Sequence, residues 1–205
     1  MRAKEEIHPT RTSLSDWMRV WSKGLLDPVA AFVLRLGLMP NTITLVGVAG
    51  NIIAGLVLSQ GHFFWGGLLV LLMGPVDALD GAMARLRGEV SDFGAFADSV
   101  SDRYSELFVY GGLIAYFLIH SEAVPAGGVF AAAAGSVLVS YTKARAESVG
   151  YQAKVGILTR FERYLVLVPS LVFGFPRIGV WIIAVLANLT ALQRIYYVRR
   201  QARRS

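Results

Sequence analysis

The chain is organised as long apolar runs separated by short polar connections. A helix that spans a membrane needs about 20 mostly apolar residues. Six runs approach or meet that length: Asn41–Ser59, Phe63–Ala84, Phe96–Ile119, Val124–Ala144, Tyr164–Phe175 and Ile178–Val198. The fifth run is short, so we expect its helix to tilt or to begin near Leu158. The pattern predicts an all-α integral membrane protein, a bundle of six transmembrane helices.

A different periodicity precedes the first run. Between Ser15 and Leu36, large apolar residues recur near helical spacing and are interleaved with basic residues. This is typical of an amphipathic helix lying in the membrane interface, although such a helix could also pack on a soluble partner. Gly37 is expected to end it and Asn41 to cap the first span. The predicted segments are a flexible arm (1–14), an interfacial amphipathic helix (15–38) and a six-span domain (39–205).

Composition supports a membrane location. Of the 205 residues, 55% are hydrophobic and 17% are charged, whereas soluble domains carry about a quarter charged residues. The excess apolar surface must face something other than water, and the same figures exclude a disordered chain. The absence of cysteine excludes a disulfide scaffold, an iron–sulfur site and a thiol nucleophile. We expect membrane lipids as partners and no nucleic acid.

Positive charge orients the predicted bundle. Lys and Arg concentrate in the N-terminal segment, in the second and fourth connections, and in the C-terminal end from Arg194 to Arg204. The first and third connections hold none, and the fifth holds only Arg177. Because cytoplasmic segments carry the excess of Lys and Arg, we expect both termini in the cytoplasm and a multi-pass protein of the inner (cytoplasmic) membrane.

Four aspartates interrupt the second and third runs. Asp77 and Asp80 are three residues apart and Asp98 and Asp102 are four apart, so each pair shares a helix face. A short connection joins the two spans, so we expect them to be antiparallel neighbours with the acids at matched depth near the cytoplasmic face. Such groups at membrane depth are costly and usually functional. Four converging carboxylates favour divalent cations such as Mg²⁺, and a two-metal site suits displacement at phosphorus.

Two other interpretations of the acids stay open from the residues alone. The first is a pair of salt-bridged helix ends that use Arg85, Arg87 and Arg103. The second is a divalent-cation transporter, because intramembrane acids also line ion pathways. A transporter predicts acids spread across the membrane, whereas these four lie at one level.

The spacing of these residues resembles the signature of the CDP-alcohol phosphotransferases. Asp77-Ala-Leu-Asp80-Gly81-Ala-Met-Ala84-Arg85, then eight residues, then Gly94-Ala-Phe-Ala-Asp98-Ser-Val-Ser-Asp102 matches all eight fixed positions over 26 residues. The resemblance implies a six-span fold with a preceding interfacial helix. It implies transfer of the phosphatidyl group of CDP-diacylglycerol to an alcohol, with release of CMP. It further implies that all four aspartates hold two Mg²⁺ ions, replaceable by Mn²⁺, and that Asp102 is the general base.

The same resemblance implies a CDP-lipid site and a dimer. The residues expected to bind the CDP-lipid are Asn41, Thr42, Asp77, Gly81, Ala84, Arg85 and Gly94. The expected assembly is a homodimer, and small residues such as Gly111, Gly112 and Gly135 would permit close contact between helices.

The acceptor alcohol is predicted from a group of basic residues on the cytoplasmic side. Its members are Lys143, Arg145, Arg160 and Arg163. They could be solvated positive-inside residues, or they could hold a phosphate on the acceptor. The runs around them resemble the prokaryotic phosphatidylinositol-phosphate synthases, which implies inositol phosphate as acceptor, although Phe161 stands where that subgroup has proline. Glycerol phosphate and serine remain alternatives.

Overall fold

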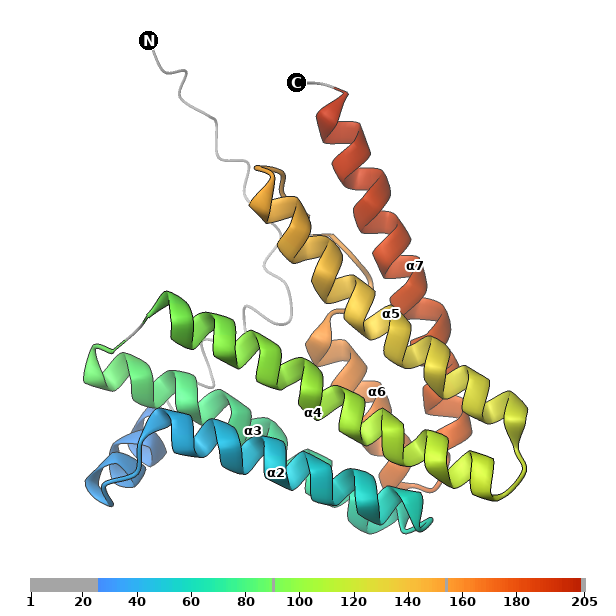
Figure 1. Cartoon of the computed structure of the whole chain (residues 1–205), viewed down its shortest axis with the longest axis horizontal. Coiled ribbons are helices and arrows are strands. Elements are labelled where there is room, and N and C mark those ends of the chain that lie inside the picture. The colour runs from blue at the N-terminus through green and yellow to red at the C-terminus, as the bar shows by residue number, and fades with distance from the viewer. Residues whose placement is uncertain (1–25, 90, 154, 204–205) are drawn as a thin grey trace.

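The computed structural model describes residues 26–89, 91–153 and 155–203, and within these ranges all regular structure is helical (Figure 1). Residues 26–35 are helical. The other helices are α2 (Pro40–Ser59), α3 (Phe63–Arg87), α4 (Asp92–Ile119), α5 (Ala123–Ser148), α6 (Arg160–Val172) and α7 (Pro176–Ala202). Each predicted run therefore corresponds to one helix. The expected flexible arm and the first part of the expected interfacial helix lie outside the described residues.

Local sequence explains most helix boundaries near the acidic residues. Gly37 follows the first described helix with a φ of 80°, a left-handed conformation that glycine adopts without strain. The expected cap of α2 at Asn41 is wrong. Met39 is the N-cap residue and Pro40 takes the first helical position, where its missing N–H has no helical partner to lose. At α4, the Ser91 hydroxyl caps the helix by accepting a hydrogen bond from the Gly94 N–H at 3.0 Å.

The helices α2 to α7 pack as a closed ring that does not follow chain order. Around the ring the order is α2, α3, α6, α7, α5 and α4, and α4 packs again on α2. The second and third spans, which we expected to be antiparallel neighbours, are therefore not adjacent in this order. The corresponding helices, α3 and α4, are consecutive in the chain, but α2 packs on both of them, and α3 and α4 are not among the closely packed pairs of the described chain. Side chains of α3, α4 and α6 can consequently meet inside the ring.

Small residues bring some of these helices into close contact. Gly112 of α4 lies against the backbone of Gly55 of α2, and Gly135 of α5 lies against Asn188 and Ala187 of α7. The Asn188 side chain also donates a hydrogen bond to the Ala131 carbonyl at 3.0 Å. Close backbone approach at small residues is a common way to pack membrane helices. Gly112 and Gly135 are therefore used inside the subunit, whereas a side chain added at Gly111 would meet open space.

Four helices of the described chain are long and apolar enough to cross a membrane, namely α2, α3, α5 and α7. Helix α4 has 28 residues, but its first half contains Asp92, Asp98 and Asp102. Helix α6 has only 13 residues. The chain thus contains several apolar helices and two further helices, α4 and α6, with charged residues in their N-terminal parts.

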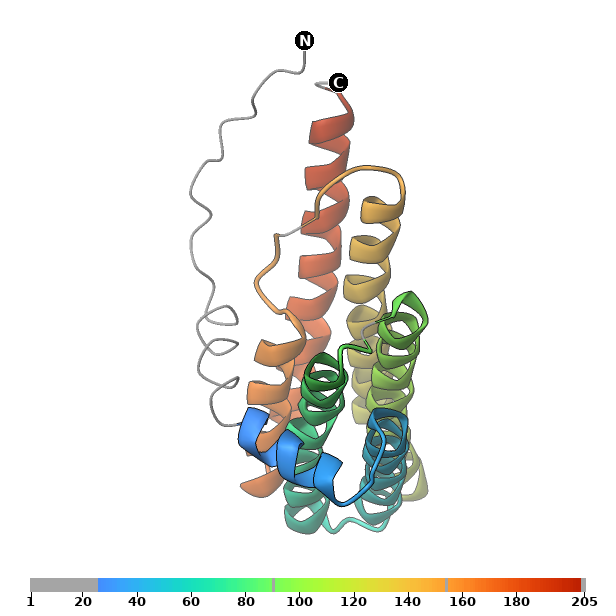
Figure 2. The ribbon, with the colours of Figure 1, turned by 90° about the vertical axis from the view of Figure 1, so that its left-hand side faces the viewer.

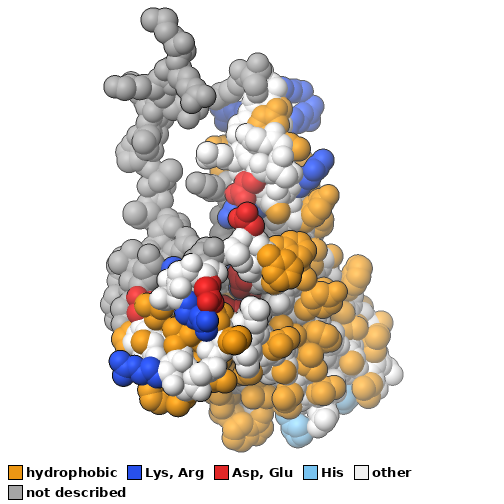
Figure 3. Space-filling model, turned by 60° about the vertical axis from the view of Figure 1, so that its left-hand side comes forward, with side chains coloured by type: hydrophobic (Ala, Val, Ile, Leu, Met, Phe, Trp, Pro, Cys, Tyr) orange, Lys and Arg blue, Asp and Glu red, His pale blue; other side chains and the backbone are white. Residues whose placement is uncertain are grey.

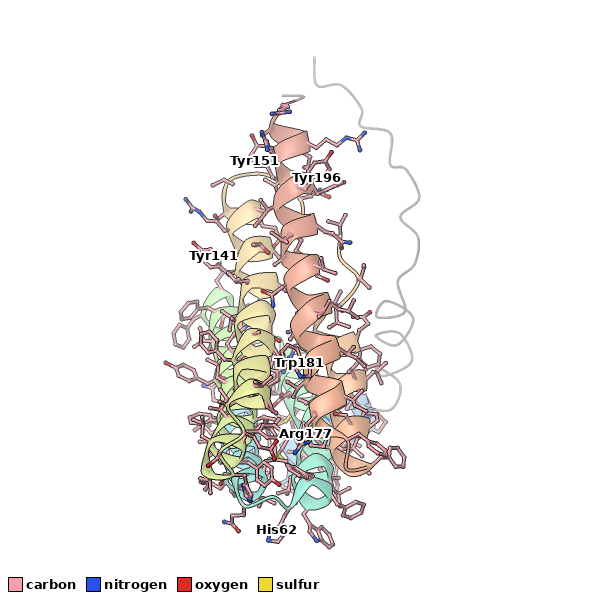
Figure 4. The ribbon with its side chains drawn as sticks, turned by 90° about the vertical axis from the view of Figure 1, so that its right-hand side faces the viewer. His62, Tyr141, Tyr151, Arg177, Trp181 and Tyr196 are labelled. Carbon is pink, nitrogen blue, oxygen red and sulfur yellow. The ribbon has the colours of Figure 1, made fainter. Side chains whose placement is uncertain are left out.

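The two ends of the bundle differ in shape and in charge. Helices α5 and α7 project beyond the ends of α3 and α4 (Figure 2). Tyr141, Tyr151 and Tyr196 lie toward this projecting end, while His62 and Arg177 lie toward the other (Figure 4). Arg177 is the second residue of α7, far along that helix from Arg199 and Arg200 of its last turn. Among the described residues, positive charge therefore gathers toward the projecting end.

Candidate active site

The α3 carboxylates are held from α2 and from the α3 backbone. Asp80 is buried, at 6% exposure, and accepts a hydrogen bond from the Thr44 hydroxyl at 2.5 Å and from the Gly81 N–H at 2.5 Å. Asp77 lies one turn earlier, and a side chain at Gly47 of α2 would collide with its Oδ1 atom. Helix α2 therefore forms the wall behind both carboxylates.

The α4 carboxylates complete a four-membered acidic group. Asp102 is buried, at 8% exposure, whereas Asp98, one turn nearer the start of α4, is exposed. Asp98 lies close enough to interact electrostatically with Asp77, Asp80 and Asp102. Acidic side chains gather around a recess above a broad hydrophobic surface in Figure 3. The structure therefore brings together the four aspartates that the sequence singled out.

A single arginine from α6 links the two acidic helices. Arg160 reaches Asp77 with Nη2 at 3.0 Å from Oδ2, and reaches Asp102 with Nη1 at 2.5 Å from Oδ2. Arg103 approaches Asp102 from its own helix at 3.3 Å. Arg160 is the first residue of α6, and its guanidinium bridges α3 and α4 from the end of the preceding connection. Positive charge thus already lies between carboxylates of α3 and α4.

A second ion pair lies one turn deeper. Arg163 is 1% exposed and makes a two-pronged contact with Glu106 of α4, with Nε at 2.8 Å from Oε1 and Nη2 at 3.2 Å from Oε2. Within the described ranges, the remaining Arg163 Nη1 is the one buried side-chain nitrogen or oxygen with no hydrogen-bond partner. Together, Arg160 and Arg163 join α6 to α4 by two successive ionic contacts, which we call the two-rung ladder.

The four aspartates are chemically suited to bind a hard divalent cation. In this structure the Arg160 guanidinium lies between two of them, Asp77 and Asp102. Among the described residues, no three acidic or histidine side chains converge closely enough to hold an ion as they stand. Carboxylate oxygens are the ligands that Mg²⁺ and Mn²⁺ prefer. The Arg160 guanidinium supplies the positive charge that Asp77 and Asp102 require, and 44% of its side chain is exposed. An exposed arginine can withdraw without opening the core.

Two of the residues expected to bind the CDP-lipid, Gly81 and Arg85, lie next to the α3 aspartates along the chain. A side chain at Gly81 would meet only Arg85 Nη1, at 3.5 Å, and Arg85 itself is exposed. Asn41 and Thr42 are exposed in the first turn of α2, and among the described residues no hydrogen bond joins either of them to the four aspartates. Thr44, which the sequence reasoning did not select, makes that contact instead. Its position three residues after Asn41, on the same helix face, is the signal that could have found it.

The basic residues expected to bind the acceptor are divided between two places. Lys143 and Arg145 are exposed near the end of α5, where Lys143 lies 4.0 Å from Glu147 and Arg145 contacts Ser148 at 3.3 Å. Arg160 and Arg163 instead point into the ring. The structure therefore joins the α6 arginines to the acidic group, whereas the side-chain contacts of Lys143 and Arg145 within the described ranges are to their own helix.

Arg194 has a different environment from the one that the sequence indicated. It was grouped with the basic C-terminal end, yet it is 6% exposed. Its Nε donates to the Val155 carbonyl at 2.8 Å, and its guanidinium also donates to the Val139 carbonyl. One helical turn earlier, the buried Thr190 hydroxyl accepts a hydrogen bond from the Leu158 N–H at 3.0 Å. Helix α7 thus holds the connection that delivers Arg160 to the site.

The fold and the site define a multi-pass helical protein whose interior carboxylates and arginines suit chemistry on phosphates within a membrane. A family model described as CDP-alcohol phosphatidyltransferase matches residues 37–192. The chain belongs to the CDP-alcohol phosphatidyltransferase family and is a multi-pass membrane enzyme.

Relatives and solved structures agree with this family. The phosphatidylinositol phosphate synthase of Streptomyces avermitilis is 39% identical over 211 residues, covering 94% of this chain and 85% of the relative. The phosphatidylinositol phosphate synthase of Mycobacterium tuberculosis with CDP-DAG bound has a TM-score of 0.79 and 30% identity, covering 84% of this chain and 92% of the neighbour. Its complex with manganese and citrate has a TM-score of 0.80 and 30% identity, covering 84% and 88%.

Proposed function

We propose that this enzyme transfers the phosphatidyl group of CDP-diacylglycerol to inositol phosphate, producing phosphatidylinositol phosphate and CMP. Support for the donor comes from the family and from the similar structure with CDP-DAG bound. Support for the acceptor comes from the names of the relatives. The observation that carries the proposal is the contact of Arg160 with Asp77 and Asp102, because it brings a phosphate-binding side chain to the signature carboxylates.

The reaction exchanges one phosphorus–oxygen bond for another. The acceptor hydroxyl oxygen bonds to the phosphorus that carries the diacylglycerol, and the bond from that phosphorus to the bridging oxygen of CMP breaks. Asp102 accepts the hydroxyl proton, and CMP leaves with the bridging oxygen. A carboxylate held within hydrogen-bond reach of the hydroxyl suits this role, and Asp102 is buried and held by ion pairs to Arg103 and Arg160.

Divalent cations complete the proposed site. Asp77, Asp80, Asp98 and Asp102 would hold two ions, Mg²⁺ in the cell and Mn²⁺ as a substitute, and the manganese complex of the similar structure supports the use of a divalent metal. Bound cations would neutralise the pyrophosphate and the leaving CMP. For them to bind, Arg160 must leave Asp77 and Asp102. Its released guanidinium is then free to bind the phosphate of the acceptor.

The remaining substrate contacts are assigned by position. Along α2, α3 and α4, the CDP-lipid would contact Asn41, Thr42, Asp77, Gly81, Ala84, Arg85 and Gly94. The open space beside Gly81 and the exposure of Arg85 support this assignment. We assign the acceptor phosphate to Arg160 and Arg163 of α6, together with Lys143 and Arg145 near the end of α5.

We further propose six membrane spans with both termini in the cytoplasm, and an active site that faces the cytoplasm from the inner membrane. The 28-residue length of α4 and the closure of the ring through α4 and α6 support six spans. The domain would comprise residues 39–205, preceded by an interfacial helix over 15–38. A homodimer is also proposed, and the open space beside Gly111 leaves a small-residue surface on α4 for a second copy.

Release of CMP from CDP-diacylglycerol, measured across a panel of acceptors, tests this function. Inositol phosphate should give faster turnover than glycerol phosphate, serine or free inositol. Faster turnover with any of these three would overturn the acceptor and leave the transferase chemistry in place. The transporter interpretation is set aside by the family to which the chain belongs.

A further inference from the structure

A proline lies inside α3 just before the first catalytic-motif aspartate. Pro75 has no N–H, so the carbonyl of Leu71, four residues earlier, receives no hydrogen bond from it along the helix. In a membrane such a freed carbonyl has no water to bind, and neighbouring side chains must satisfy it. Asp77 follows Pro75 by two residues. The weakest point of the α3 backbone therefore lies directly beside the acidic group.

The Tyr164 hydroxyl of α6 fills the missing donor position. It donates to the Leu71 carbonyl at 2.6 Å, and the Val70 carbonyl lies 3.2 Å from the same oxygen. Gly74 makes this approach possible, because a Cβ atom at Gly74 would lie 2.7 Å from the Tyr164 hydroxyl oxygen. A tyrosine hydroxyl on α6 thus replaces one backbone N–H of α3.

The same face of α6 contacts α3 on both sides of the proline. Tyr164 binds before it, at Leu71, and Arg160, one turn earlier on α6, pairs with Asp77 after it. When a cation takes the place of Arg160, the contact after the proline is lost. The contact of Tyr164 then remains to hold the two halves of α3 in register.

We propose that Tyr164 is a positioning residue: its hydroxyl substitutes for the absent Pro75 N–H and thereby fixes where Asp77 stands relative to the carboxylates of α4. Tyr164 acts through the α3 backbone and does not touch the substrates. The inference depends on the family's chemistry and not on which alcohol is the acceptor, so it survives if inositol phosphate proves to be the wrong substrate.

The test is Tyr164→Phe, which keeps the ring and removes the hydroxyl. Measured by CMP release with the best acceptor of the panel, kcat should fall about tenfold and the KM values of both substrates should change less than twofold. The half-saturating Mn²⁺ concentration should rise severalfold, both in turnover and in the Mn²⁺-dependent shift of the melting temperature without substrates. The matched control is Tyr110→Phe, which removes a buried hydroxyl contact to Ser136, 3.2 Å long, elsewhere in the ring. It should leave the Mn²⁺ dependence unchanged.

A double-mutant cycle makes the mechanism falsifiable. Pro75→Ala restores an N–H four residues after Leu71, so Tyr164→Phe should have little further effect on Mn²⁺ dependence in that background. Two results would overturn the proposal. One is an equal effect of Tyr164→Phe with and without Pro75→Ala, and the other is an unchanged Mn²⁺ dependence when Tyr164→Phe is made alone in the protein that keeps Pro75. If Tyr164→Phe does not fold, Gly74→Ala serves instead, because it displaces the hydroxyl and keeps the tyrosine. Gly74→Ala should then raise the half-saturating Mn²⁺ concentration, and wild-type Mn²⁺ dependence in this variant would equally overturn the proposal.

Discussion

At the scale of single residues, Asp102 combines the features expected of the general base. It is the buried carboxylate of the α4 pair, and it contacts arginines from two directions. Asp98, one turn earlier, is exposed, and it forms no ion pair with any residue that the structure describes. The arginines keep Asp102 oriented toward the ring interior, where the acceptor hydroxyl would arrive.

Asp102→Asn should lower turnover by about 10²-fold to 10⁴-fold, the range that general acid–base catalysis contributes. Binding of CDP-diacylglycerol should persist, because Asp77, Asp80 and Asp98 remain. CMP release and equilibrium binding of the CDP-lipid measure the two effects. Asp92→Asn, a change at an exposed acid in the first turn of the same helix, is the control and should retain turnover. Turnover close to that of the wild type in Asp102→Asn would remove Asp102 from the role of base.

Arg160→Gln should have opposite effects on the metal and on the acceptor. Without the guanidinium, a cation meets no competitor at Asp77 and Asp102, so Mn²⁺ should bind about tenfold more tightly, which corresponds to about 1.4 kcal/mol. The acceptor KM should rise far more than the donor KM, because a phosphate contact is lost. Calorimetric titration with Mn²⁺ and steady-state kinetics provide the two readouts. Unchanged Mn²⁺ affinity would show that arginine and metal do not compete. The control is Arg177→Gln at the other end of the bundle, which should alter neither the Mn²⁺ affinity nor the acceptor KM.

At the scale of helices, the two-rung ladder between α4 and α6 is a structural element in its own right. Its deeper rung joins two side chains in the ring interior, and Arg163 is almost fully buried. A buried arginine without its carboxylate is an uncompensated charge. Removing one partner of such a pair costs about 3–5 kcal/mol, far more than the pair itself contributes to stability.

Glu106→Gln should therefore destabilise the folded protein strongly. We expect the melting temperature in detergent to fall by several degrees or more, with loss of activity in proportion to unfolding. The matched control is Glu122→Gln, which breaks the Arg177 pair of 2.6 Å at the other end of the bundle. Because 61% of the Arg177 side chain is exposed, that change should cost at most about 1 kcal/mol. Equal melting temperatures for the two variants would mean that the Arg163–Glu106 pair does not stabilise the packing of α6 on α4.

The helices could be predicted well from the sequence, and their packing could not. Apolar runs set the helix positions, so the ends of α2 and α4 at Ser59 and Ile119 match the predicted ones. The first turns of α4, at Asp92, were missed because charged residues there resemble a connection. The ring order depends on which faces fit together, as at Gly55 and Gly112, and a hydropathy pattern carries no such information.

The same division applies to the candidate site. The four aspartates could be found because charge at membrane depth stands out and because their spacing matches a family signature. Tyr164 could not, since a hydroxyl on an apolar helix gains meaning only from the group opposite it. Arg194 resembled an ordinary basic residue of the C-terminal end. Only the fold reveals that it binds the Val155 carbonyl.

At the scale of the whole molecule, catalysis should depend on a divalent metal. CMP release should stop in excess EDTA and return on addition of Mg²⁺ or Mn²⁺. The protein should stay folded without metal, because Arg160 then neutralises Asp77 and Asp102, and circular dichroism in EDTA checks this. Undiminished turnover in excess chelator would contradict a metal-dependent reaction.

The two-rung ladder also constrains how the molecule can be assembled in the membrane. With 13 residues and two arginines in its first turn, α6 is a poor candidate to enter the bilayer alone. Its arginines are neutralised by acids of α3 and α4, which lie earlier in the chain. We therefore expect biogenesis to follow a fixed order, in which α4 is integrated before α6, and α6 enters together with the apolar α7, to which a tight turn at residues 173–175 joins it.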